Sequence, residues 1–191
     1  MRLEVFVDTA VAAESVEAVQ FALDTFREQT PQLALAQPEV TRIQLDDLVP
    51  QHGKQVDSAV IESVTPWNNR SFDVYLASRD LGASDARIAY CYGRSRFAGG
   101  ALIMSAARLD SVDLFGLTLH ESGHAVGLVG EDKPQYDATS RFEGHCSNAC
   151  VMEAVNNPDD MRRVTTTVLS KTTTIGFCDD CADHLHKVRL A

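Results

Sequence analysis

Alternation of apolar and polar positions over residues 3–8 predicts a strand, and apolar residues at helical spacing over residues 13–27 predict a following helix. β-branched and aromatic residues dominate another strand-like segment at residues 72–77. The same criteria predict four further elements: strands at residues 40–45, 87–92 and 101–105, and a helix at residues 56–64. This alternation favours an α/β (α+β) fold, in which helices pack on a twisted mixed sheet.

A second long helix is predicted at residues 110–128, whose side chains are apolar almost all round, so we expect it to be buried. Gly116 and Gly123 lie on one face of this helix and would let another element approach closely. Its ends carry candidate caps: Asp110 or Ser111 at the start, and Gly127 or Gly130 at the end.

The rest of the chain has weaker periodicity. Residues 130–144 are polar without a clear period, and the hydroxyl-rich residues 165–174 are typical of a loop or an exposed ribbon. Residues 181–190 predict a final helix. Because no Pro/Gly/Ser-rich linker divides the chain, we expect one domain over residues 1–191, with residues 146–191 as its compact C-terminal lobe.

Composition narrows the partners of this chain. The chain has 191 residues and a formal net charge of −10, which argues against a general affinity for nucleic acid or for a membrane surface of anionic lipids. No apolar stretch has the length of a membrane span. The first residues enter a strand pattern without an apolar leader and cleavage site, so the expected location is cytoplasmic.

The predicted helix at residues 110–128 carries the motif HExxH at His120, Glu121 and His124. Histidines four residues apart lie on one face of a helix, one turn from each other, where both imidazoles can bind one ion. Glu121 lies about 100° around the helix from His120, so it can sit beside a metal as a general base without being a ligand. Three polar side chains in a buried helix need partners, and a metal would serve all of them.

Four of the five cysteines form two close pairs, Cys146 with Cys150 and Cys178 with Cys181. Two pairs of thiolates separated by a connecting segment are what a closed tetrahedral zinc site needs. Disulfides, which are rare in cytoplasmic proteins, and unrelated buried thiols are the alternatives. The fifth cysteine, Cys91, is expected to be a buried bystander.

A catalytic zinc commonly has three protein ligands, so one ligand must come from outside the helix. Gly127 completes HExxHxxG and would let the chain turn sharply out of the helix. Gly130, three residues later, has no side chain that could bind a metal. The remaining candidates are His145 and the acidic pair Glu131 and Asp132.

The ordered motifs HExxHxxG, His145-Cys146, Cys150-x-Met152 and Cys178-x-x-Cys181 resemble the archaemetzincin branch of the metzincin metallopeptidases. The resemblance covers residues 97–181. It implies a catalytic zinc on His120, His124 and His145, with Glu121 as the base and Met152 in a methionine turn below the metal. It also implies a second, structural zinc, whose ligands would be Cys146, Cys150, Cys178 and Cys181.

This sequence departs from the family pattern after Gly127, where residues 130–144 are an insertion before His145. The insertion leaves Glu131 and Asp132 open as alternative ligands, and it could shape or cover the substrate cleft. The resemblance further implies that residues 97–105 form the edge strand that borders the cleft and pairs with an extended substrate.

These observations favour a zinc-dependent peptidase with two zinc ions and a peptide or protein substrate. In this hypothesis zinc polarises the scissile carbonyl and lowers the pKa of water, while Glu121 takes the water proton and passes it to the leaving amine. A zinc-dependent endoribonuclease with an H-x3-H-x2-G helix is an alternative, which the acidic charge and Glu121 disfavour. A third hypothesis is a non-catalytic binding module stabilised by zinc.

Overall fold

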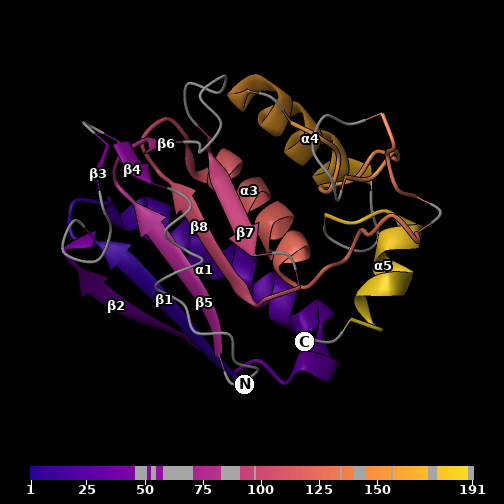
Figure 1. Ribbon diagram of the computed structural model, residues 1–191, viewed down its shortest axis with the longest axis horizontal. Coiled ribbons are helices and arrows are strands. Elements are labelled where there is room, and N and C mark those ends of the chain that lie inside the picture. The colour runs from indigo at the N-terminus through magenta and orange to yellow at the C-terminus, as the bar shows by residue number, and fades with distance from the viewer. Residues whose placement is uncertain are drawn as a thin grey trace.

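A five-stranded sheet forms the centre of the computed structural model, with strand order β2-β1-β5-β8-β7 (Figure 1). The model describes residues 1–45, 51–52, 55–57, 71–82, 91–96, 98–133, 135–139, 145–155, 157–171 and 176–188. The strands of this sheet are β1 (Arg2–Asp8), β2 (Pro38–Ile43), β5 (Ser71–Ala77), β8 (Ala101–Ser105) and β7 (Gly93–Arg96). All neighbours are parallel except β7, which runs antiparallel to β8. The prediction of a mixed sheet is therefore confirmed.

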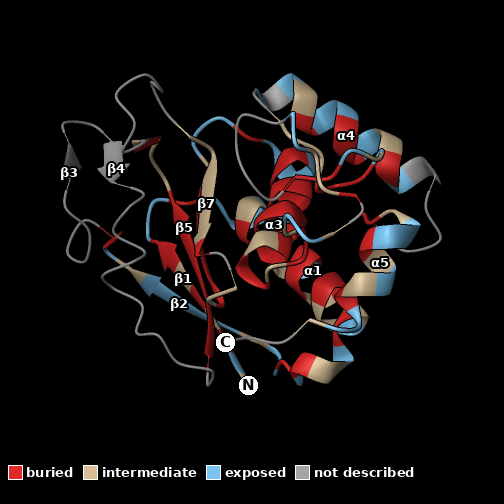
Figure 2. Ribbon diagram, turned by 45° about the vertical axis from the view of Figure 1, so that its right-hand side comes forward, coloured by how far each residue is buried: buried red, intermediate tan, exposed pale blue. Residues whose placement is uncertain are grey.

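Three short strands form a second sheet: β3 (Gln51–His52), β4 (Gln55–Asp57) and β6 (Leu81–Gly82). The helices are α1 (Ala13–Gln29), a 3-10 turn η1 (Pro31–Leu33), α3 (Ser111–Ala125), α4 (Pro158–Lys171) and α5 (Asp179–Leu185). Figure 2 shows α1 and α3 against one face of the large sheet, with α4 on the far side of α3. No helix within the described part of the chain is long and apolar enough to cross a membrane.

Alternating side chains of the central strands build a core on each face of the sheet. Val5 and Val74 belong to the larger buried cluster, which lies under α1 and α3, whereas Tyr75 and Ile103 belong to a smaller cluster on the opposite face. All seven residues of β5 are buried. After Asp73 the strand is an uninterrupted apolar run, Val74–Ala77, which is typical of a strand covered on both faces.

Helix α3 lies within the range that its apolar pattern predicts, and both of its ends have clear causes. Asp110 caps the start by accepting from the backbone N–H groups of Val112 and Asp113, each at 3.0 Å. The Asp113 carboxylate accepts in return from Asp110 N, which completes a capping box. At the other end Gly127 has φ of +68°, a conformation that glycine adopts without a steric penalty.

Two predictions in the first half of the chain need correction. The helix expected at residues 56–64 is wrong at its start, because Gln55–Asp57 is strand β4, and residues 58–64 lie outside the described part. The strand expected at residues 87–92 is shifted: β7 begins at Gly93, and Cys91 forms an isolated bridge with Leu81. Residues 87–90 are outside the described part.

The expectation of an edge strand at residues 97–105 is also wrong. Ala101–Ser105 is β8, which lies between β5 and β7 and is buried along its whole length. The strand at the edge is β7. The order of strands in a sheet depends on contacts between distant segments, so an apolar run alone does not distinguish an inner strand from an edge strand.

The loop or ribbon expected at residues 165–174 is wrong as far as Lys171, because α4 extends to that residue. Met161, Val164, Thr165 and Val168 recur at helical spacing and are all buried. Packing of this face on α3 explains why a segment rich in threonine, a weak helix former, is nevertheless helical. Residues 172–174 are outside the described part.

We expect Gly116→Ala to lower the free energy of unfolding by about 1–3 kcal/mol, the usual cost of overpacking a core. A methyl group at position 116 would overlap Thr165 Oγ1 and lie 3.0 Å from Thr165 Cβ and 3.2 Å from Met161 Sδ. The better helix propensity of alanine, worth about 1 kcal/mol, offsets only part of this cost. Urea denaturation of both proteins measures the difference.

The matched control is Thr165→Ala in the Gly116→Ala background, which removes the overlapping hydroxyl. Thr165 Oγ1 is buried and has no hydrogen-bond partner among the described residues, so its loss breaks no hydrogen bond there. We expect the double variant to recover part of the lost stability. A double variant as unstable as Gly116→Ala would show that contact with Thr165 is not the cause.

Candidate metal centre

Helix α3 brings His120 and His124 together at its C-terminal end, as their spacing predicts. Their Nε2 atoms are 3.1 Å apart. His120 Nδ1 lies 2.7 Å from the carbonyl oxygen of Val151. Because a carbonyl oxygen can only accept, Nδ1 of His120 carries the proton, and the lone pair of Nε2 is left for a metal.

His145 completes the group from outside the helix. Its ring centroid lies 5.3 Å from that of His120 and 5.0 Å from that of His124. One nitrogen from each ring lies within 4.8 Å of the other two. The carbonyl oxygen of His145 accepts from Asp137 N at 2.8 Å, and the next residue, Cys146, forms a β-bridge with Tyr136. Part of the 130–144 segment therefore holds the backbone that carries His145.

The acidic alternatives lie away from this group. Glu131 and Asp132 are exposed, and the Asp132 carboxylate pairs with Lys133 at 2.8 Å. The group of potential ligands that forms around the helix consists of His120, His124 and His145. The geometry thus favours His145 over either acidic residue as the third ligand.

The three histidines suit a zinc ion. Zn–N bonds of about 2.0–2.1 Å in a tetrahedron place two nitrogen ligands about 3.3 Å apart, close to the separation of the His120 and His124 nitrogens. Burial lowers the pKa of His120 to about 4 and lowers the pKa of His124 well below its usual value, so both rings are neutral near pH 7. Neutral imidazole is the form that binds a metal. Three protein ligands would leave a fourth position open.

Glu121 lies beside these histidines and points toward strand β7. The Ser95 hydroxyl contacts the Glu121 carboxylate and lies 2.8 Å from the Glu121 carbonyl oxygen. Burial raises the pKa of Glu121 to about 7, against the opposing effects of the Ser95 hydrogen bond and the positive charge of Arg94. A carboxyl group with a pKa near neutrality is suited to take up and release a proton.

Ser95 and Gly93 lie beside Glu121 but are not predicted as site residues from the sequence. Nothing in their local pattern marks them, because serine and glycine are common in loops and the strand was expected to end at residue 92. Only the pairing of β7 with β8, beside α3, brings them to Glu121.

Met152 lies directly against α3 at Gly123, the residue before His124. Its side chain is fully buried, and a methyl group at Gly123 would overlap its sulfur. This confirms the close approach expected at Gly123. The preceding residue, Val151, supplies the carbonyl oxygen that orients His120, and its N–H donates to Gly176 O at 2.8 Å. The turn at residues 150–152 therefore packs against α3 and orients the ring of His120.

The cysteine pairs also converge, as their spacing predicts. The sulfur atoms of Cys146, Cys150, Cys178 and Cys181 all lie within 4.8 Å of one another. Cys146 Sγ and Cys178 Sγ are 3.8 Å apart, close to the separation of about 3.8 Å expected for two thiolates at 2.3 Å from a tetrahedral zinc. None of the four is in a disulfide.

Polar groups around the sulfurs suit thiolates bound to a cation. Asn148 N donates to Cys146 Sγ at 3.4 Å, and Cys178 N donates to Cys150 Sγ at 3.3 Å. Hydrogen bonds between the thiols lower the pKa of Cys178 and raise the pKa of Cys150, because neighbouring sulfurs share protons. If all four groups were thiolates, their mutual repulsion at this distance would need a cation between them.

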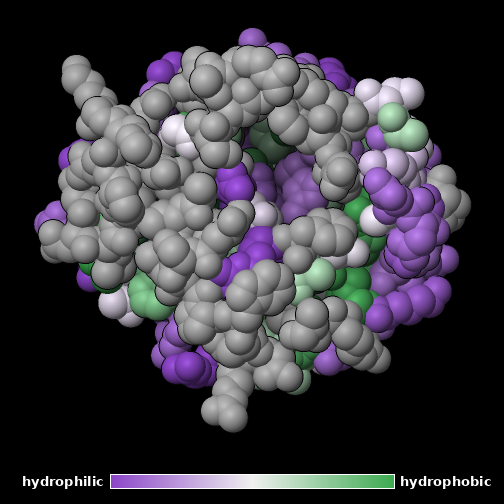
Figure 3. Space-filling model, viewed as in Figure 1, coloured by the Kyte–Doolittle hydropathy of each residue, from purple (hydrophilic) through white to green (hydrophobic). Residues whose placement is uncertain are grey.

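Helix α5 supplies part of this cysteine cluster. Its inner face carries the buried residues Cys181 and Leu185, and its outer face carries the exposed acidic residues Asp179, Asp180 and Asp183. The hydrophilic outer surface of α5 appears at the right of Figure 3. Gln135, from the segment before His145, reaches inward to within 3.8 Å of Cys181 Sγ.

The histidine and cysteine groups share two stretches of backbone. His145 directly precedes Cys146, and Val151 lies between Cys150 and Met152. Cys146 N donates to Met152 O at 2.8 Å and joins the two stretches. An ion held by the cysteines would therefore fix the position of His145 and the carbonyl partner of His120.

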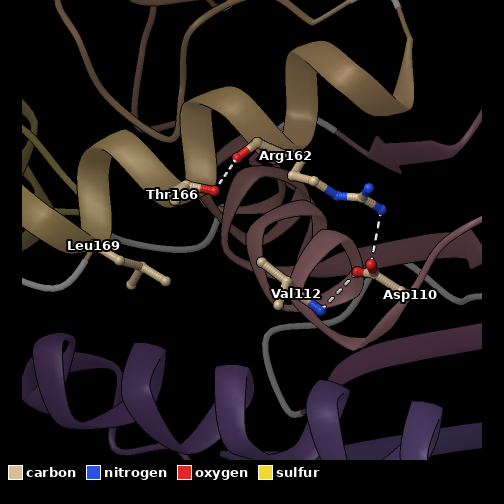
Figure 4. A pocket seen from close by; sticks show the side chains of 5 residues that line it. All are labelled: Asp110, Val112, Arg162, Thr166 and Leu169. Carbon is tan, nitrogen blue, oxygen red and sulfur yellow. Dashed lines mark hydrogen bonds and ion pairs between the residues drawn. The ribbon is translucent and has the colours of Figure 1, made fainter.

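A surface hollow of about 630 Å³ lies elsewhere, between the start of α3 and α4 (Figure 4). Its lining residues are Asp110, Val112, Arg162, Thr166 and Leu169. Arg162 pairs there with Asp110 at 2.7 Å. Val112 and His124 are about 18 Å apart along the helix axis, so this hollow is separate from the histidine group.

The overall fold is shared with solved structures of two archaemetzincins and of a zinc-dependent peptidase. The archaemetzincin from Archaeoglobus fulgidus, complexed with malonate, matches with a TM-score of 0.66 and 18% identity, over 96% of this chain and 99% of that chain. The archaemetzincin from Methanopyrus kandleri matches with a TM-score of 0.61 and 20% identity, over 97% of this chain and 93% of that one.

A zinc-dependent peptidase from Methanocorpusculum labreanum matches with a TM-score of 0.60 and 19% identity, over 96% of this chain and 100% of that chain. No family model matches the sequence, and no curated protein matches it either. The resemblance inferred from the ordered motifs is thus confirmed at the level of the fold, over nearly the whole chain.

Proposed function

We propose that this protein is a zinc-dependent peptidase. The observation that carries the proposal is the convergence of His120, His124 and His145, with the buried Glu121 beside them, in a fold shared with zinc-dependent peptidases. Three imidazole ligands with one open position are typical of a catalytic zinc rather than a structural one.

The proposal includes two zinc ions per chain with different tasks. The histidine group would hold the catalytic ion. The second ion would have a structural role, because four thiolates leave no open position on it. Its ligands would be Cys146, Cys150, Cys178 and Cys181. One buried cluster contains both Leu3 and Leu185, which supports a single domain over residues 1–191.

When bound at the histidines, zinc supplies a Lewis acid that polarises a carbonyl oxygen and lowers the pKa of water. Glu121 accepts a proton at its carboxylate as the water oxygen forms its bond to the carbonyl carbon. It then donates that proton to the amine nitrogen as the C–N bond breaks. The carbonyl oxygen of Val151 holds His120 in the tautomer that can bind a metal, and Met152 packs against α3 at Gly123.

Strand β7 is the proposed site for the substrate backbone. It lies at the edge of the sheet, next to Glu121, and among the described strands it pairs with β8 alone. An extended peptide can add to such an edge through main-chain hydrogen bonds. Gly93–Arg96 thus takes the role that the family resemblance implied for residues 97–105.

Incubation of the zinc-loaded protein with a peptide library and with structured RNA tests the proposal. We expect cleavage of peptides, no cleavage of RNA, and loss of peptide cleavage when zinc is removed. Cleavage of RNA alone would favour the endoribonuclease. Binding of two zinc ions without any cleavage would favour a non-catalytic module.

A further inference from the structure

Strand β7 presents two small residues to the side chain of Glu121. Side chains alternate between the faces of a strand, so Gly93 and Ser95 share the face toward α3. The Ser95 hydroxyl contacts Oε2 of Glu121, and it also lies 2.8 Å from the main-chain oxygen of the same residue. One hydroxyl on the edge strand thus reaches both the backbone and the carboxylate of Glu121.

Gly93 leaves the space that the Glu121 side chain occupies. A Cβ atom at position 93 would lie 2.5 Å from Oε1, 2.7 Å from Cδ and 2.8 Å from Cγ of Glu121. Real Cβ atoms do not approach other atoms so closely. The glutamate therefore lies flat against β7, with glycine beneath it and the serine hydroxyl at its end.

We propose that Ser95 is a positioning residue for Glu121, whose hydroxyl holds the carboxylate in one orientation against β7. This inference rests on the proposed function, in which Glu121 is the general base. A glutamate side chain has three rotatable bonds, and fixing it in advance of the reaction avoids an entropic cost during the proton transfer. Serine suits this task because its hydroxyl can donate to the carboxylate of Glu121 and can accept from the same group once it is protonated.

The location of Ser95 predicts which kinetic constant changes. A peptide that adds to the edge of β7 would bind through the backbone of that strand, which Ser95→Ala leaves intact. The hydroxyl acts on the base alone, so its loss should slow the proton transfer without weakening substrate binding. We therefore expect kcat to fall while KM stays the same.

Steady-state kinetics of zinc-loaded Ser95→Ala and Ser95→Thr test this inference. Misplacement of a catalytic group by about 1 Å can cost about 100-fold in rate, so we expect kcat of Ser95→Ala to fall by about 10- to 100-fold. KM should change by less than about twofold, and Ser95→Thr, which keeps the hydroxyl, should recover most of the rate. An unchanged kcat in Ser95→Ala, or an equal loss in Ser95→Thr, would overturn the proposal.

Ser105→Ala is the matched control, because it removes another serine hydroxyl from the same sheet. Ser105 Oγ donates to Arg79 O at 2.8 Å, on a different strand from Ser95. We expect wild-type kcat for this variant. A fall in kcat equal to that of Ser95→Ala would mean that loss of any serine hydroxyl from this sheet is sufficient, and would overturn the specific role of Ser95.

Crystal structures of the zinc-loaded wild type and Ser95→Ala provide a second readout that needs no substrate. We expect one Glu121 rotamer in the wild type and a displaced or divided carboxylate in Ser95→Ala. An unmoved, single rotamer in Ser95→Ala would overturn the inference even if the wild type cleaved peptides. If the wild type cleaves no peptide but its carboxylate moves in the variant, the proposed function fails and the positioning contact stands.

Discussion

Glu121→Ala is expected to abolish peptide cleavage while both zinc ions stay bound. The proposed mechanism needs a group that takes a proton from water and returns it to the leaving amine, and general acid–base catalysis contributes about 10²- to 10⁴-fold. The carboxylate points toward β7, so its removal leaves all three histidines in place. The measurement is kcat/KM on a peptide substrate, with zinc content determined on the same sample.

Glu131→Ala is the matched control for this variant. Glu131 is an exposed glutamate shortly after α3, and the structure places it outside the histidine group. We expect this variant to cleave peptides at the wild-type rate. Normal cleavage by Glu121→Ala would show that Glu121 is not the base. Loss of zinc from Glu121→Ala but not from the control would contradict the expectation that the carboxylate acts without holding the metal.

The second large effect is expected from Cys181→Ser, which removes one of the four thiolates. Structural zinc sites contribute about 10–16 kcal/mol of binding free energy, so losing the ion should remove several kcal/mol of stability. For a chain of this size that corresponds to a fall in Tm of roughly 10 °C or more. Thermal unfolding followed by circular dichroism measures it.

Loss of the cysteine-bound ion should also weaken the histidine site. His145 is joined to Cys146, and the carbonyl partner of His120 lies between Cys150 and Met152. We therefore expect Cys181→Ser to retain less than one zinc ion per chain under conditions where the wild type retains two. Cys91→Ser, which changes the one cysteine outside the cluster, should keep both ions. An unchanged Tm and two bound ions in Cys181→Ser would contradict a structural role for an ion bound by the four cysteines.

Local sequence rules were sufficient for the parts of the site that lie on one element. His120 and His124 are four residues apart on a helix, so their common face follows from helical geometry alone. The cysteine pairs likewise follow from the short spacing within each pair. The apolar pattern of residues 110–128 also gave the position of α3 to within a few residues.

Parts that depend on contacts between distant segments could not be obtained in this way. His145 lies far from His124 in the sequence, and its position is fixed by hydrogen bonds of Asp137 and Cys146 that no periodicity reveals. Strand β7 is an edge strand only because β8 pairs with β5 on its other side. Ser95 becomes part of the site through that arrangement, and α4 is helical because its buried face packs on Gly116.

Anomalous diffraction at the zinc absorption edge tests the central claim most directly. In crystals of the zinc-loaded protein we expect one peak about 2.0–2.1 Å from a ring nitrogen each of His120, His124 and His145. A second peak should lie about 2.3 Å from the four cysteine sulfurs. A carboxylate of Glu131 or Asp132 bound in place of His145, or no metal at the histidines, would contradict the account.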